Sequence, residues 1–406
     1  MRRKYFIYVF CVLAALAVGC SRTADVEMPD VTDEDAWIHD ISLPVPVEFD
    51  LPSTKGVVDD LSDLVDNSSV FGIFAVDKKA TDFSVQNSFS KDMFNRFCTY
   101  VGGDSPSLRF GYKGENRTLY YPVKSDTSFN FYTYYTRTTE LVSLSDATPV
   151  LYDGDDIQAV SEASSTDAGI YVAISVARPY DVLYGAAEVD PYVDGIDGFN
   201  ADYIRTTGKR PVFSFSHPAA GLGFRVQYDA EGSSAVGEYE YLELSALVFN
   251  NVPTKAVLCI VDLTNKNNNG KFVQAVATSE ESFWIKGNTG NLAVPLVYCE
   301  HAAGSSDLTG IVSLGSEHFM MPAEEITMTA EVVYWQFYRK SDGTIGTRGR
   351  WPLSCSFTLN PAKDAADLNL KGFEAGQMYR YLLTIRFTKA GEVPSIAVTA
   401  EPDIAG

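Results

Sequence analysis

Apolar and polar residues alternate along much of the chain, and the pattern is strictest near its beginning. In the sequence VPVEFDL at 45–51, large apolar residues at every second position are separated by proline or acidic residues. Such period-two alternation predicts a half-buried β-strand, and Pro46, which lacks a backbone N–H, favours the edge or the end of a sheet. The side chains expected on the apolar face are Val45, Val47, Phe49 and Leu51.

The same pattern predicts strands over most of the remaining chain. Polar turns such as TNKNNNGK and KGNTGN separate apolar segments that recur roughly every 8–15 residues. This spacing indicates antiparallel sandwiches, and therefore an all-β fold, rather than a parallel sheet with helices between its strands. Helical periodicity is sparse, with candidates at 59–67 and 91–100. Predicted strands lie at 69–76, 107–112, 117–123, 128–136, 167–177, 211–217, 221–229, 239–252, 255–263, 271–278, 291–298, 325–338, 378–387 and 394–401.

Residues 1–20 read as a secretory signal peptide. Three basic residues precede an apolar stretch from Tyr5 to Val18, which is shorter than the about 20 residues that a membrane-spanning helix needs. The stretch ends in Ala-Val-Gly-Cys, which resembles the lipobox of bacterial lipoproteins, with Ala17 where leucine is common. In that class the chain is cut before the cysteine, which is then acylated with palmitate or similar chains, so Cys20 is the predicted lipidation site. The alternative is an ordinary signal peptide with an incidental cysteine.

Residues 21–37 are predicted to be an acidic tether. The sequence SRTADVEMPDVTDED holds six acids and almost no large apolar residue, so it cannot bury enough surface to fold. An acylated Cys20 would hold the protein at the cell outer membrane without a transmembrane helix. Acidic stretches in this position also resemble the surface-export signal of Bacteroidales lipoproteins. The alternative is a linker that carries no export signal.

The charge balance narrows the functions open to the chain. Lys and Arg number 32 against 53 acids, a net charge of −21, and a field of this sign repels phosphate backbones, which excludes nucleic acid as a partner. A hydrophobic share of 46% and an aromatic share of 13% indicate a folded, β-rich protein with a sizeable core.

Four cysteines follow the predicted lipidation site. Export permits disulfides, and four cysteines allow three pairings. Two of them, however, lie in the apolar segments AVLCIVDL and LSCSFTL, where cysteine also serves as a small buried residue, so both states stay open. No CxxC pair is present, which excludes a zinc ribbon. The cysteines are Cys98, Cys259, Cys299 and Cys355.

No catalytic signature is present. The chain lacks the GxxxxGK[ST], HExxH and GxSxG patterns, so we expect neither an enzyme nor a cofactor. The acids of 153–156 and 190–202 lack the spacing of a calcium loop, and no metal site is predicted. His217, at a strand end before a proline, is interpreted as a turn or capping residue. The aromatic run at 129–135 could stack on sugars, but aromatic residues of a sandwich more often face its core.

Five segments in order along the chain, from VPVEFDLPSTKGVV to FEAGQMYRYLLTIRF, resemble the fimbrillin-like (Mfa-like) family of Bacteroidales fimbrial lipoproteins. The segment VPVEFDLPSTKGVV is similar to that family's opening strand and the basic site after it. YDVLYG, followed about thirty residues on by VFSFSHPAAGLGFRV, resembles its passage into a second domain. The other similar segments are TLYYPVKSDTSFNFYTYY, HFMMPAEEITMTAEVVY and FEAGQMYRYLLTIRF.

This resemblance implies two transthyretin-like antiparallel β-sandwich domains in tandem. With the polar stretch 188–210 as the junction, the domains are expected at 38–205 and 206–406. It also implies assembly by strand exchange, in which a protease removes the first strand and a strand of another subunit replaces it. The displaceable strand would be 45–51, and the cut would follow Lys55, the first basic residue after it. The alternative is an uncut strand in an anchor or tip subunit.

Two functions follow from these patterns. The first is a structural subunit of a surface fimbria, as stalk, anchor or tip, lipid-anchored in the outer membrane and partnered by other fimbrial subunits. The alternative is a surface lipoprotein that binds glycans or host ligands through the same sandwiches.

Overall fold

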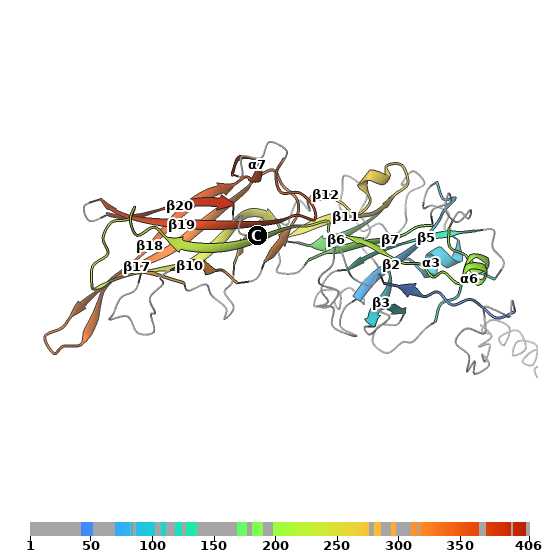
Figure 1. Cartoon of the computed structure of the whole chain (residues 1–406), viewed down its shortest axis with the longest axis horizontal. Coiled ribbons are helices and arrows are strands. Elements are labelled where there is room, and N and C mark those ends of the chain that lie inside the picture. The colour runs from blue at the N-terminus through green and yellow to red at the C-terminus, as the bar shows by residue number, and fades with distance from the viewer. Residues whose placement is uncertain are drawn as a thin grey trace, which may run out of the picture.

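The computed structural model forms two lobes that lie end to end, each built from two β-sheets (Figure 1). We call the lobe that contains the beginning of the described chain the first lobe and the other the second lobe. The described residues are 42–51, 70–81, 83, 87–101, 107–110, 118–123, 127–135, 169–176, 181–189, 198–275, 280–285, 294–297, 310–315, 317–364, 371–390 and 393–402.

The larger sheet of the first lobe has seven strands in the order β1-β4-β3-β2-β5-β7-β8. All its neighbouring strands are antiparallel. One face covers a core of aromatic and aliphatic side chains that two short helices also enter. The strands are β1 (Phe49–Asp50), β2 (Val70–Asp77), β3 (Arg96–Val101), β4 (Ser107–Phe110), β5 (Phe129–Tyr135), β7 (Leu183–Ala187) and β8 (Ser214–Ser216).

The smaller sheet of the first lobe lies on the opposite face of β2, β5 and β7. It consists of β12 (Phe272–Ala275), β11 (Lys255–Asp262) and β6 (Gly169–Ser175), in that order. A second core fills the space between the two sheets, and it includes Phe74 and Tyr132 from the large sheet and Ile260 from the small one. β5 is buried along its whole length because a core covers each of its faces.

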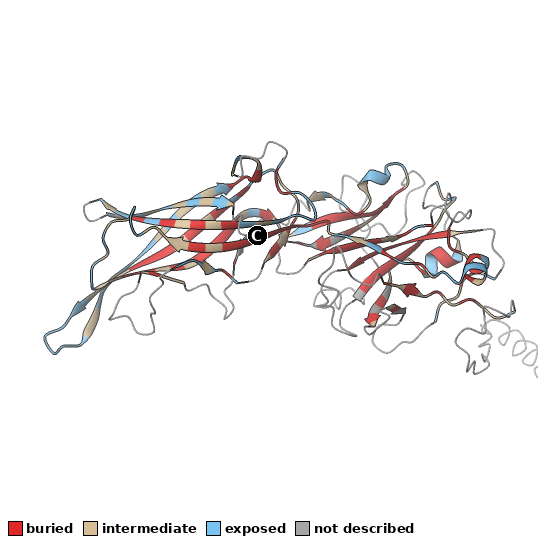
Figure 2. Cartoon of the chain, in the orientation of Figure 1, coloured by how far each residue is buried: buried red, intermediate tan, exposed pale blue. Residues whose placement is uncertain are grey.

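The second lobe is a sandwich of two five-stranded sheets with one core between them. More and less buried positions alternate along much of β17 and along β20 (Figure 2). Of the strand pairs that the structure describes, only β9 and β19 run parallel. One sheet contains β13 (Glu280–Trp284), β10 (Glu240–Pro253), β17 (Ile326–Arg339), β18 (Ile345–Leu359) and β14 (Val294–Val297). The other contains β15 (Val312–Ser313), β9 (Ala220–Tyr228), β19 (Met378–Ala390), β20 (Val393–Pro402) and β16 (His318–Met320).

Helices are few and short in the described part of the chain. Each of α3 and α6 begins at an asparagine whose side chain accepts a bond from a backbone N–H of the first turn, as N-caps do. The predicted helix at 91–100 is wrong, because α3 ends at Asp92 and Arg96–Val101 pairs with β2 and β4. The predicted helix at 59–67 lies outside the described residues. The helical segments are α3 (Ser88–Asp92), α6 (Ala201–Thr207), η2 (Lys266–Asn268) and α7 (Pro361–Asp364).

The all-β, antiparallel sandwich predicted from the alternation is confirmed. The strand order also shows how the chain passes between the lobes. β8, β11 and β12 follow residue 206 in the sequence, yet they belong to the sheets of the first lobe: β8 pairs with β7, β11 with β6, and β12 with β11. The polar stretch before residue 210 therefore does not separate the strands of the two lobes, because strands that come later complete both sheets of the first lobe.

Candidate functional site

Residues 42–51, which we call the N-terminal strand, lie with one face in the core of the first lobe. The four side chains that the alternation placed on one face are all buried. The side chains of Glu48 and Asp50, in between, remain 45% and 46% exposed. The buried side chains, with their exposed fractions, are Val45 at 1%, Val47 at 2%, Phe49 at 0% and Leu51 at 5%.

The backbone of the N-terminal strand is bound along both of its edges. On one edge Val47 N–H donates to Leu119 O at 2.8 Å, and Tyr121 N–H donates to Val45 O at 2.9 Å. Further along, Phe49 and Asp50 pair with β4. On the other edge Asp50 N–H donates to Pro211 O at 3.0 Å, and Asp50 forms a parallel bridge with Val212. β1, which is part of the N-terminal strand, lies beside β4 at one end of the seven-stranded sheet, and residues 211–212 lead into β8 at the other end. The N-terminal strand therefore connects the two ends of the sheet.

Phe49 is the centre of the contacts beneath the strand. Its ring lies 5.0 Å from that of Phe213, 5.1 Å from Phe131 and 5.7 Å from Phe110, measured between centroids. These rings come from the segment before β8, from β5 and from β4, so Phe49 binds three separate parts of the sheet. Aromatic pairs of this kind add roughly 0.5–1.5 kcal/mol each to the free energy of burial. We call the residues that contact the N-terminal strand its seat.

Two arginines hold the exposed side and the beginning of this strand. Arg210 Nη2 lies 2.8 Å from Glu48 Oε2, and Arg210 Nη1 lies 3.8 Å from Asp50 Oδ1. Arg205, on α6, donates to the carbonyl oxygen of Leu43 at 2.5 Å. Gly208 caps the end of α6, and its φ of 66° lets the chain turn back towards the strand. The alternation could identify the buried face of the strand, but nothing local in the sequence indicated these two arginines.

Cys20 and Lys55 lie outside the described residues. The described part of the N-terminal strand ends at Leu51, four positions before Lys55. The structure thus brings together the four apolar residues of the predicted displaceable strand, and the predicted lipidation and cleavage sites stay predictions. No helix among the described residues is long and apolar enough to span a membrane.

Three of the four cysteines after Cys20 lie in the described chain and are free thiols. Burial raises the pKa of the Cys98 thiol well above its usual value and that of Cys259 to about 12, so both remain protonated at neutral pH. Cys355 is partly exposed on β18, and Cys299 lies outside the described residues.

The described residues contain no group of three or more His, Cys, Asp or Glu that could hold a metal ion. His217 Nδ1 is bonded to Asp181 Oδ2, which fastens the end of β8 to the start of β7. Asp181 also accepts a bond from the Val182 N–H. This geometry corresponds to a histidine that joins two strand ends.

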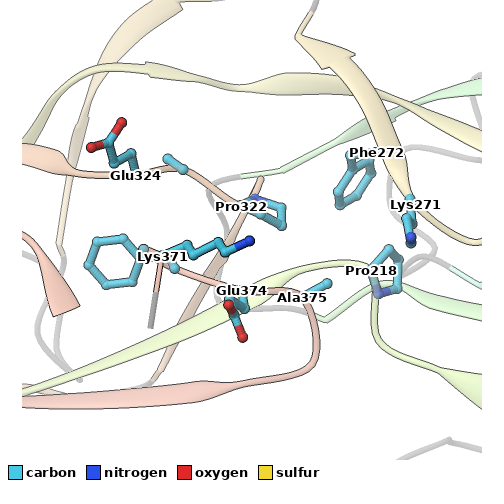
Figure 3. Close-up of a pocket in the computed structure, with 11 residues that line it drawn as sticks. Pro218, Lys271, Phe272, Pro322, Glu324, Lys371, Glu374 and Ala375 are labelled. Atoms are coloured by element: carbon cyan, nitrogen blue, oxygen red, sulfur yellow. The ribbon is translucent and has the colours of Figure 1, made fainter. Parts of the chain in front are cut away.

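A pocket of about 410 Å³ lies where the two lobes meet (Figure 3). Phe272 and Lys271 line it from the first lobe, and residues 322–324 and 371–375 line it from the second. The charged residues of the lining are Lys271, Lys371, Glu324 and Glu374, so the lining has no net charge. The balance of charge favours neither an anionic nor a cationic ligand.

No protein-family model matches the sequence, and no curated protein matches it either. Solved structures do resemble the fold. A fimbrial protein of Bacteroides vulgatus is 13% identical, with 88% of this chain and 99% of that chain covered and a TM-score of 0.47. A protein of Bacteroides uniformis, provisionally assigned to cell adhesion, is 15% identical over 89% of this chain and 98% of its own, with a TM-score of 0.42.

The fimbrial anchor protein Mfa2 of Porphyromonas gingivalis is 9% identical, with 88% and 97% of the two chains covered and a TM-score of 0.31. Two of these three solved structures are described as fimbrial proteins and the third is provisionally assigned to cell adhesion. The segments of the sequence singled out above resemble the same class.

Proposed function

We propose that this protein is a structural subunit of a surface fimbria, anchored through Cys20 in the outer membrane, and not an enzyme. The observation that carries the proposal is the N-terminal strand. It comes first in the described chain, it fills a core with four side chains, and it is followed within four residues by Lys55.

The free energy gained by burying the side chains of the N-terminal strand is large enough to drive strand exchange between subunits. Burying a Val, Leu or Phe side chain is worth about 1.5–3 kcal/mol, so the four together contribute about 6–12 kcal/mol. This is comparable to the whole free energy of unfolding of an ordinary domain. A lobe without the strand would be unstable until another strand with the same alternation took its place. The unpaired backbone groups along both edges of the empty seat would template that strand.

In this proposal a protease cuts after Lys55, the N-terminal strand leaves, and a strand of a neighbouring subunit enters the seat. The two lobes are then two tandem transthyretin-like domains of one fimbrial subunit, with other subunits as partners. The ion pairs of Arg210 would favour an incoming strand with acidic residues on its outer face.

The test compares the N-terminus of the protein isolated from cells with the number of filaments on those cells. Lys55→Ala should leave a chain that begins at Cys20 and should abolish filaments that contain it. Lys55→Arg should preserve both the cut and the filaments. Lys266→Ala, which removes an exposed lysine elsewhere on the first lobe, is the control. If the wild-type chain begins at Cys20 and filaments persist with Lys55→Ala, strand removal is wrong, and an uncut anchor or tip subunit takes its place.

A further inference from the structure

The β17–β18 hairpin extends beyond the rest of the second lobe (Figure 1). The two strands are paired over fourteen positions, from Ile326 with Leu359 to Arg339 with Ile345. Towards its turn the residues are exposed or only partly buried, on both strands (Figure 2). Both faces of this end of the hairpin are therefore open to a partner.

The hairpin end carries a charge opposite to that of the protein. Residues 335–351 contain four basic residues and one acid, whereas the whole chain has a net charge of −21. The acid, Asp342, accepts bonds from the N–H and the hydroxyl of Thr344 at 2.9 and 2.6 Å, so it serves the turn. Within the described chain none of the four basic side chains forms an ion pair. They are Arg339, Lys340, Arg348 and Arg350.

Two aromatic rings lie flat on one face of the hairpin. The register pairs Tyr338 with Gly346, and a Cβ on that glycine would lie 2.7 Å from the tyrosine ring. A Cβ on Gly349 would lie 2.2 Å from the ring of Trp351. Both rings thus rest where the glycines have no side chain, with one side against the backbone. The outer sides are accessible, since Tyr338 is 46% and Trp351 37% exposed.

The opposite face combines aromatic rings with a guanidinium group. Trp335 and Phe337 are parallel to within 6°, with their centroids 6.3 Å apart. The guanidinium carbon of Arg350 lies 5.4 Å from the centre of the Trp335 ring. Stacking on the indole holds the planar guanidinium in place while its N–H groups stay free to donate.

We propose that this hairpin end is a binding site for glycan chains that carry carboxylate or sulfate groups. Exposed aromatic rings offer flat surfaces on which the apolar faces of sugar rings pack. The planar guanidinium groups match the paired oxygens of a carboxylate or a sulfate. A local positive charge on an otherwise acidic surface also directs an anionic chain to this end of the molecule. The inference does not depend on the fimbrial role.

The experiment measures the binding of hyaluronan, which carries carboxylates, of chondroitin sulfate and of neutral dextran to the purified protein. We expect binding of the two anionic chains, weakened by added salt because the attraction is partly electrostatic. Tyr338→Ala with Trp351→Ala, and separately Arg348→Gln with Arg350→Gln, should each weaken it at least about tenfold. The control is Lys363→Gln with Arg380→Gln, which removes the same charge elsewhere on the second lobe and should leave affinity unchanged.

Circular dichroism and the melting temperature verify that each variant folds. If the variant without the two aromatic rings does not fold, the double arginine variant, which keeps the rings, still tests the proposal. Equal affinity of the wild type and both hairpin variants would overturn the proposal. So would equal binding of dextran. Binding of a synthetic peptide of residues 22–37 in place of the glycans would identify the hairpin as a contact for an acidic protein segment instead.

Discussion

The ring of Phe49 stacks on that of Phe213, with 5.0 Å between centroids and 29° between ring planes. Phe49 belongs to the first described segment of the chain, and Phe213 lies more than 160 residues later, just before β8. Both are fully buried. The core beneath the N-terminal strand is therefore completed by a segment from the far end of the same sheet.

Replacement of Phe49 by alanine should strongly destabilise the first lobe. The change removes a fully buried ring and its contacts with three others, for which the expected cost is about 3–5 kcal/mol. Denaturant unfolding monitored by circular dichroism measures it. Glu48→Ala, next to it on the exposed face, breaks only a surface ion pair with Arg210 and should cost less than about 1 kcal/mol. Similar costs for the two variants would contradict the arrangement.

Gly270, between η2 and β12, should be intolerant of even a methyl group. Its φ is 73°, and a Cβ there would lie 2.4 Å from the Tyr184 ring on β7. Strain in the backbone and crowding of the ring predict a loss of about 2–4 kcal/mol for Gly270→Ala. Gly208→Ala is the matched control, because its φ of 66° is similar but no atom lies within 4 Å of the added Cβ. It should cost about 1 kcal/mol, and thermal unfolding of both variants tests the difference.

Glu240 should make the stability of the second lobe depend on pH in the acidic range. Burial alone would raise the pKa of this carboxyl, but bonds from the Gly237 N–H, Lys389 and Tyr334 outweigh burial and hold its pKa at about 2. Because the pKa is lowered in the folded state, the ionised carboxyl stabilises that state at pH values above its ordinary pKa of about 4.5. This stabilisation is lost as the pH falls towards 2.

Glu240→Gln should therefore cost roughly 1.5–3 kcal/mol at pH 7, the worth of a hydrogen bond to a charged group. The difference from wild type should shrink between pH 4.5 and pH 2. Urea unfolding at pH 7, 4 and 2.5 gives the comparison. Glu401→Gln, on the exposed side of β20, should stay within about 0.5 kcal/mol of wild type. A difference at Glu240 that does not vary with pH would exclude the ionic contribution.

Cys20→Ser should abolish acylation of the protein in cells. The serine lacks the thiol to which the lipid is attached, so labelling with a palmitate analogue should be lost. Cys11→Ser, within the apolar stretch of the signal peptide, is the control and should leave the label intact. Undiminished label in Cys20→Ser protein would remove the lipoprotein assignment, whereas the fold of the two lobes would be unaffected.

Strands with alternating apolar residues were predictable from the sequence, and so were continuous apolar segments such as β5 and β11. β9, β10, β17 and β19 lie within a few residues of their predicted positions, because residues at about every second position of each strand pack into the core of the second lobe. β18 was missed because, near its turn, Gly346, Gly349 and Pro352 interrupt the pattern on an edge strand that is exposed at many positions. In β3 the apolar residues around Phe94 resembled a helical face, but pairing with β2 and β4 outweighs that local preference.

Some features of the candidate site could likewise be predicted from the sequence, and others could not. Alternation identified the buried face of the N-terminal strand, since a strand shows its two faces in its own sequence. Its partners Phe213 and Arg210 could not be inferred, because contacts between segments so far apart leave no local trace. The proposed site on the β17–β18 hairpin could not be inferred either, because only the structure shows that the rings of Tyr338 and Trp351 lie over glycines.

The interleaving of the two lobes also governs the order in which a newly made chain can fold. Synthesis delivers β9 and β10 before β11 and β12, so the first lobe still lacks two strands when the second has begun to appear. A nascent chain that stops before residue 255 leaves β6 without its partner β11. Among the described strands, the first lobe can therefore complete its core only after residue 275 has emerged, and the second lobe only after β20, at 393–402, has emerged.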